Sequence, residues 1–109
     1  MDNKRKIGDK LEKYIVSYLQ EIDPKTKQSN NSGAISNNGD IQTSKFLIEC
    51  KHRNTKNLTI QKKTWDKLCG QIPVGSNKIP LLIMRNIDNE VFAVLGFKDL
   101  IQLLKERNE

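Results

Sequence analysis

The sequence has few of the residues that build zinc sites, disulfide frameworks or membrane segments. Only two of its 109 residues are cysteine and one is histidine, and Cys50 and Cys69 have neither a CxxC spacing nor a Cys/His partner spacing. A zinc site is therefore not expected, and both cysteines are predicted to be buried free thiols in a reducing cytosol. No apolar run has the length of a membrane span, and no apolar segment follows the basic residues 4–6 as it would in a signal peptide. We therefore expect a cytoplasmic protein with no membrane partner.

The length and charge of the chain indicate one basic domain. Residues 1–109 are expected to form a single unit with one core, because this is the size of an ordinary domain. The net charge is +6, and the whole excess lies in residues 1–67, with 14 Lys/Arg and 8 Asp/Glu, whereas residues 68–109 hold five of each. A basic half attracts phosphates and is typical of proteins that act on nucleic acids, although a requirement for solubility alone would explain it equally well.

Hydrophobic periodicity predicts a mixture of helices and strands. Three segments with apolar residues at helical spacing are predicted to be helices: 7–22, with Tyr14, Tyr18 and Ile22 on its apolar face, 60–72, with Thr59 as a possible N-cap, and 98–105. Four segments are predicted to be strands: 40–42, 46–51, 79–84 and 91–95, the last two as a hairpin. The continuously apolar run 79–84 favours a strand buried on both faces of a mixed sheet. Residues 24–38 are polar, and their composition predicts a flexible loop.

The stretch 39–51 is predicted to bring two carboxylates and an ammonium group together. Side chains alternate along a strand, so Glu49 and Lys51 share one face while Phe46, Ile48 and Cys50 form a row on the other, core-facing side. With residues 40–42 as the preceding hairpin strand, Asp40 reaches Glu49 across the sheet. The alternative is an exposed Glu49–Lys51 ion pair on a half-solvated strand, worth well under about 1 kcal/mol.

This set of groups has a clear use in phosphodiester chemistry. Two carboxylates with water suit Mg²⁺ or Mn²⁺, which prefer oxygen ligands. Such an ion lowers the pKa of bound water and neutralises charge on a phosphate, and a nearby lysine orients the water or stabilises the developing charge. Without a cation, two carboxylates about 5 Å apart repel each other by about 3 kcal/mol at an effective dielectric near 20.

The order of these residues resembles the PD-(D/E)xK nuclease superfamily. Three short segments resemble, more narrowly, the Holliday-junction resolvases of archaeal and phage type: Ser32-Gly33-Ala34, Gly39-Asp40-Ile41 and Phe46-Leu47-Ile48-Glu49-Cys50-Lys51. That branch also carries a glutamate on its first helix, which Glu12 matches. The chain departs from the superfamily pattern in having Gly39, not proline, before Asp40. The resemblance covers about the first two thirds of the chain.

The resemblance implies a fold and a set of residue roles. The fold is α/β, a restriction-endonuclease-like core with a mixed β-sheet flanked by helices in the order αβββαββα, which adds a short edge strand within residues 24–38. Asp40 and Glu49 would bind magnesium or manganese, and Glu12 would complete or support that site. Lys51 would position the attacking water and Ser32 would contact the scissile phosphate. Contacts to DNA are expected from basic and amide side chains near the site: Arg5, Lys6, Asn31, Arg53, Lys56 and Lys62.

The implied function is a metal-dependent, structure-specific DNA endonuclease, in particular a Holliday-junction resolvase that makes paired cuts as a homodimer. A phage-encoded resolvase, for which so compact a chain would be suitable, would act in the cytoplasm of the host cell. Two alternatives stay open. A nicking, flap or restriction-type nuclease would use the same site on another DNA shape. A non-catalytic nucleic-acid-binding module would need only the basic half and the Asn-rich loop.

Overall fold

The computed structural model describes residues 3–28 and 40–107, and side chains from residue 10 onward. Three helices are formed: α1 (Asn3–Ile22), α2 (Lys62–Gly70) and α3 (Phe97–Arg107). Five strands lie between them: β1 (Lys27–Gln28), β2 (Ile41–Gln42), β3 (Phe46–His52), β4 (Ile79–Arg85) and β5 (Val91–Val94). The predicted element order αβββαββα is confirmed, and the fold is α/β with a mixed sheet. No helix in the described part of the chain is long and apolar enough to cross a membrane.

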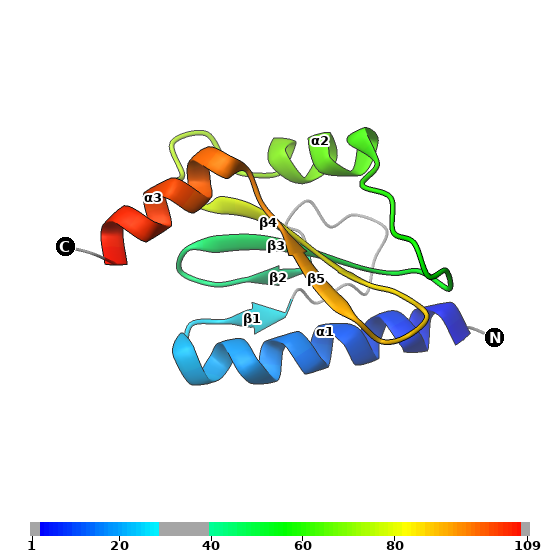
Figure 1. Ribbon diagram of the computed structural model, residues 1–109. Coiled ribbons are helices and arrows are strands. Elements are labelled where there is room, and N and C mark those ends of the chain that lie inside the picture. The colour runs from blue at the N-terminus through cyan, green and yellow to red at the C-terminus, as the bar shows by residue number, and fades with distance from the viewer. Residues whose placement is uncertain (1–2, 29–39, 108–109) are drawn as a thin grey trace.

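The five strands form one sheet in the order in which they occur along the chain (Figure 1). Strands β1, β2 and β3 are antiparallel neighbours, β3 and β4 are parallel, and β4 pairs with β5 as an antiparallel hairpin. The connection from β3 to its parallel neighbour runs through α2, as a parallel crossover requires. The β4–β5 turn passes through Asn89, whose φ of 63° lies in the left-handed region that asparagine tolerates better than most residues.

Helix α1 covers one face of the sheet (Figure 1). Leu11 and Ile15 of this helix are buried against apolar side chains of three strands, namely Ile41, Ile48, Leu81 and Ile83. Phe46 and Cys50 pack at the edge of the same cluster, so the predicted core-facing row of β3 is confirmed. The period-two alternation of β3 therefore places Glu49 and Lys51 on the opposite face.

Helix α2 covers that opposite face (Figure 1). Leu68 is buried against Leu47 of β3 and against Leu82 and Met84 of β4, and Trp65 packs beside them. Strand β4 is therefore buried on both faces, as its continuous apolar sequence predicted. Within the described sheet, β3 and β4 contribute buried side chains to both core clusters.

Several local predictions were wrong at the helices. Tyr14, Tyr18 and Ile22 are exposed, because α1 uses a narrower apolar stripe and the two tyrosine rings pack edge to face on its outer side, with centroids 5.1 Å apart. Helix α2 begins at Lys62 and its N-cap is Gln61, which makes no capping side-chain hydrogen bond, so Thr59 is not the cap. Both cysteines are free, as predicted, but only partly buried.

The central strand provides a test of the fold. Leu82 of β4 is fully buried under α2, and we expect Leu82→Ala to lower the free energy of unfolding by about 2–5 kcal/mol through lost burial and the cavity that remains. Urea denaturation followed by circular dichroism measures this change. Val74→Ala removes an equally apolar but fully exposed side chain and should change stability by less than about 0.5 kcal/mol. Equal effects of the two substitutions would contradict the assigned core.

Candidate active site on strands β2 and β3

The β2–β3 hairpin places Asp40 directly opposite Glu49. Ile41 pairs with Ile48 in the antiparallel register, so the next residue toward the N-terminus of β2 faces the next residue along β3. Two hydrogen bonds hold Asp40 there: its N–H donates to the Ile48 carbonyl at 2.9 Å, and the Cys50 N–H donates to Asp40 Oδ2 at 2.8 Å. The predicted approach of Asp40 to Glu49 across the sheet is thus confirmed by the register.

The hairpin turn is stabilised by side-chain hydrogen bonds of Thr43 and Asp23. Thr43 Oγ1 accepts from the backbone N–H groups of Lys45 and Phe46 at 3.1 and 2.9 Å, which closes the tight turn between the strands. Asp23 Oδ2 accepts from the Ser44 N–H at 2.7 Å, and this bond lowers the pKa of Asp23. Helix α1 is thereby connected to the hairpin turn, which orients the strands that carry the carboxylates.

Glu49 and Lys51 form an ion pair on one face of β3. Lys51 Nζ lies 3.2 Å from Glu49 Oε2, and only 14% of the Glu49 side chain and 32% of the Lys51 side chain are exposed. Both side chains are therefore largely covered, unlike the exposed pair of the alternative, and they share their face of β3 with the apolar layer beneath α2. In the parallel register Glu49 pairs with Leu82 and Lys51 with Met84, both of which belong to that layer.

The ionised form of the Asp40 carboxyl group is unfavourable in the folded chain. Burial, and after it the nearby Glu49 carboxylate, raise its pKa to about 7, although the Cys50 N–H and Lys51 act in the opposite direction. Asp40 is therefore partly protonated at neutral pH in the absence of a cation. The same burial, with the neighbouring carboxylates, raises the pKa of the Cys50 thiol far above its ordinary value, so Cys50 is not a nucleophile at neutral pH.

Glu12 stands beside this pair without joining it. Its Oε1 accepts a hydrogen bond from Gln28 Nε2 of β1 at 2.9 Å, and its charge contributes to the raised pKa of Asp40. Among residues 10–28 and 40–107, no three His, Cys, Asp or Glu side chains lie close enough together to hold a metal ion as a cluster. Glu12 thus acts on Asp40 electrostatically, and its predicted role of completing or supporting the metal site stays a prediction.

The remaining pair fits a magnesium ion on chemical grounds. Asp40 and Glu49 supply hard carboxylate oxygens from adjacent strands, and magnesium characteristically takes one or two carboxylates and keeps several waters. A cation at this position would offset the burial and the repulsion by Glu49 that together raise the pKa of Asp40. The two residues that could hold the metal are therefore Asp40 and Glu49, with Lys51 beside them.

Four of the residues predicted to contact the phosphate or DNA cannot be placed. Ser32 and Asn31 lie outside the described residues. Arg5 and Lys6 belong to the first turns of α1, but their side chains also lie outside the description. Their predicted contacts with DNA stay predictions.

The three other predicted DNA contacts are exposed. Arg53 follows β3, and its Nη1 donates to the carbonyl of His52 at 3.0 Å. Lys62 forms an ion pair with Asp66 one turn along α2, which neutralises part of its charge. Lys56 lies in the loop after β3 and lines a pocket. Arg53 and Lys56 are thus exposed basic residues in the loop that follows β3.

Two polar pairs near the site were missed by sequence reasoning. Gln28 contacts Glu12, although its polar loop composition suggested no structural role. Arg85 Nε donates to His52 Nδ1 at 3.0 Å, and the other ring nitrogen of His52 contacts Asn54 Oδ1. His52 is thus held by neighbours on both sides and lies apart from the carboxylates. The parallel pairing of His52 with Arg85 creates this contact, and only the strand register could have predicted it.

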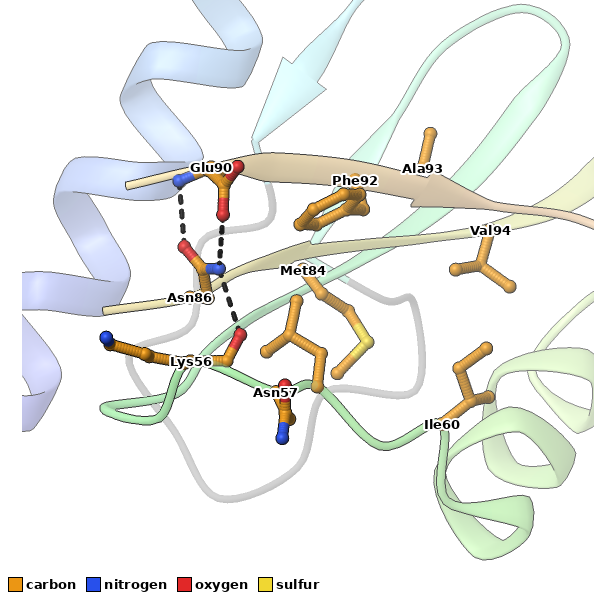
Figure 2. Close-up of a pocket in the computed structure, with 10 residues that line it drawn as sticks. Lys56, Asn57, Ile60, Met84, Asn86, Glu90, Phe92, Ala93 and Val94 are labelled. Atoms are coloured by element: carbon orange, nitrogen blue, oxygen red, sulfur yellow. Dashed lines mark hydrogen bonds between the residues drawn. The ribbon is translucent and has the colours of Figure 1, made fainter. Parts of the chain in front are cut away.

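A pocket of about 640 Å³ lies between the loop after β3 and the β4–β5 hairpin (Figure 2). Met84, Phe92 and Val94 share one side of the β4–β5 hairpin, and Ile60 faces them from the loop before α2. Asn86 closes one end: its Nδ2 donates to the Lys56 carbonyl and to Glu90 Oε1, as Figure 2 shows. Because the amide of Asn86 is satisfied within the protein, its role is to connect the loop after β3 to the hairpin.

The raised pKa of Asp40 predicts a pH-dependent stability. The folded chain binds this proton more tightly than the unfolded chain, so the stabilising contribution is present at low pH and is lost as pH rises through about 7. In a chelating buffer we expect the free energy of unfolding to fall by about 2–3 kcal/mol from Asp40 between pH 5 and pH 8.

Urea denaturation across this pH range, with the wild type and Asp40→Asn, measures the contribution. The variant should lose this part of the pH dependence, whereas the exposed control Asp88→Asn should retain it. A pH profile that is the same in the wild type and in Asp40→Asn would show that folding does not raise the pKa of Asp40.

Comparisons with protein-family models, curated proteins and solved structures give no match to this chain.

Proposed function

We propose that the chain is a metal-dependent endonuclease that hydrolyses DNA phosphodiesters at Asp40, Glu49 and Lys51. One observation carries the proposal: two strands place Asp40 opposite Glu49, and an ammonium group forms an ion pair with Glu49 on the same face. Burial and the neighbouring Glu49 carboxylate raise the pKa of Asp40, so two ionised carboxylates at this position are unfavourable for folding. A divalent cation would convert this unfavourable pair into a binding site.

The residues have separate roles in this proposal. Asp40 and Glu49 hold the ion, which when bound supplies an activated water and neutralises charge on the phosphate. Lys51 orients the water and stabilises negative charge on the phosphate in the transition state. Glu12 adds negative potential behind Asp40, and Ser32 contacts the scissile phosphate. Hydrolysis would leave a 5′-phosphate, as the resemblance to the PD-(D/E)xK nucleases implies.

The finer proposal is a restriction-endonuclease-like fold and a Holliday-junction resolvase. The element order, the mixed sheet and the position of the acidic pair on β2 and β3 support it. A four-way junction requires two matched cuts, and a homodimer with two-fold symmetry would supply two sites. The basic residues 1–67 would face the DNA, with Arg53 and Lys56 exposed near the end of β3 and Arg5, Lys6, Asn31 and Lys62 as further proposed contacts.

Metal binding is the first prediction. At pH 8 and a concentration one hundred times its dissociation constant, Mg²⁺ should stabilise the fold by about 2.7 kcal/mol and raise the melting temperature by several degrees. The rise should be smaller at pH 5.5, because the ligands must be deprotonated. Asp40→Asn and Glu49→Gln should abolish the rise, whereas Lys51→Ala and Asp88→Asn should retain it. An equal rise in Asp40→Asn would place the ion elsewhere.

Cleavage is the second prediction. An end-labelled four-way junction, a linear duplex and a flap are incubated with Mg²⁺ or with chelator. We expect paired, symmetric cuts on the junction that are lost in chelator. Asp40→Asn and Lys51→Ala should each be reduced at least about 100-fold, and the exposed control Lys25→Ala should stay close to wild type.

The other outcomes of this assay separate the alternatives. Cutting of the duplex or flap would keep the nuclease and reject the resolvase. Salt-sensitive binding without any cutting, unchanged in Asp40→Asn, would show a non-catalytic nucleic-acid-binding module.

A further inference from the structure

Helix α3 has the sequence of a packed helix but presents its apolar stripe to solvent. Phe97, Leu100, Ile101 and Leu104 occur at positions i, i+3, i+4 and i+7, which place them on one face. Of these, Phe97 is 74% exposed, Leu100 38% and Leu104 48%. The structure describes every residue of α3, and none of them is buried. The apolar face of α3 is thus only partly covered within a single copy of the chain.

A helix of this kind needs a packing partner. Isolated helices shorter than about 12–15 residues are marginal in water, and α3 has 11 residues. The ion pair between Lys45 and Glu106 near its C-terminal end is exposed, and exposed pairs contribute little. Burial of Phe97, Leu100 and Leu104 against another surface is the interaction that would stabilise the helix.

Strand β5, which leads directly into α3 (Figure 1), also carries exposed apolar side chains. β5 is the outer strand of the sheet, and all four of its residues, Val91 to Val94, are uncharged and apolar. Val91 and Phe92 are exposed. Natural proteins protect such edge strands with charges or proline, or cover them with a helix or loop, because an unprotected edge can pair with another chain. We define the β5–α3 patch as the outer edge of β5, with Val91 and Phe92 on its two faces, together with the exposed residues Phe97, Leu100 and Leu104 of α3.

Charge identifies the occupant of the patch. The chain has a net charge of +6, so two copies repel each other through their basic halves. The patch lies in residues 68–109, which hold five basic and five acidic residues. A second copy can therefore approach there without net repulsion, whereas a polyanion is attracted to residues 1–67. The outer position of β5 also suits a two-fold arrangement, since an antiparallel partner strand can be identical to it.

We infer that the β5–α3 patch is the surface through which two copies of this chain associate about a two-fold axis. The inference deepens the proposed function and rests on it in one respect: paired cuts need two sites. It also carries a geometric consequence, because the carboxylate pair lies on β2 and β3, away from the associating edge at β5. The two proposed sites would thus stay open to DNA in the dimer.

Sedimentation velocity of the full chain, without DNA or metal, tests the inference. We expect a dimer at 10–50 µM in the wild type. Leu100→Lys with Leu104→Lys should weaken dimerisation at least 100-fold and give a monomer, and Phe92→Thr with Phe97→Gln provides a second, milder disruption. Ile22→Lys and Val74→Lys place the same charge at other exposed apolar positions and should stay dimeric. Circular dichroism and thermal unfolding establish that each variant is folded.

The outcomes that would overturn the inference are specific. A wild type that stays monomeric up to 200 µM would do so, as would a patch variant that is folded and still dimeric. Dissociation by Ile22→Lys or Val74→Lys to the same extent as by the patch variants would place the interface elsewhere.

Junction cleavage by the same variants separates this inference from the proposed nuclease. Single, unpaired nicks by the monomeric patch variant, still dependent on Mg²⁺, would support both. A wild-type dimer that never cleaves DNA would leave the assembly standing and reject the nuclease. A wild-type monomer that cleaves DNA would keep the nuclease and reject the assembly.

Discussion

The parallel pairing of β3 with β4 is the interaction on which the rest of the structure depends. Seven residues of each strand are in register, from Phe46 with Ile79 to His52 with Arg85. Because both strands carry apolar residues on both faces, this pairing creates two cores, one beneath α1 and one beneath α2. The polar residues Glu49, Lys51 and His52 occur only toward the end of β3, where this apolar double layer gives way to solvent.

The candidate site brings two carboxyl groups close together in a partly buried position. Elsewhere, buried polar groups such as those of Thr43 and Asn86 are satisfied by local hydrogen bonds. Asp40 is also hydrogen-bonded, through the Cys50 N–H, but it faces Glu49 and is largely removed from water. In natural proteins, unfavourable local arrangements of this kind occur mainly at functional sites. Here the arrangement is confined to the β2–β3 hairpin. The fold tolerates it because the hairpin is held independently by Thr43 and Asp23.

Residues close in sequence were predicted well because covalent geometry relates them. The alternation of side chains in β3 correctly separated Phe46, Ile48 and Cys50 from Glu49 and Lys51. The short connection between β2 and β3 correctly placed Asp40 opposite Glu49. The position of Glu12 was harder to predict, since it depends on how α1 crosses the sheet and on a hydrogen bond from Gln28 of β1. Helical periodicity also overestimated the buried face of α1, because Tyr14 and Tyr18 pair with each other instead of with the sheet.

The sequence by itself determined the order of the elements, the two faces of β3 and the acidic pair with its lysine. These features follow from the 3.6-residue and two-residue periods of helix and strand, which act over a few neighbouring residues. Only the tertiary structure decided how deeply Glu49 is buried, that Glu12 stands beside the pair, and that no residue of α3 is fully buried within its own chain. Those features depend on which distant segments pack together and on how much apolar surface one sheet of five strands can cover, and periodicity carries no information about either.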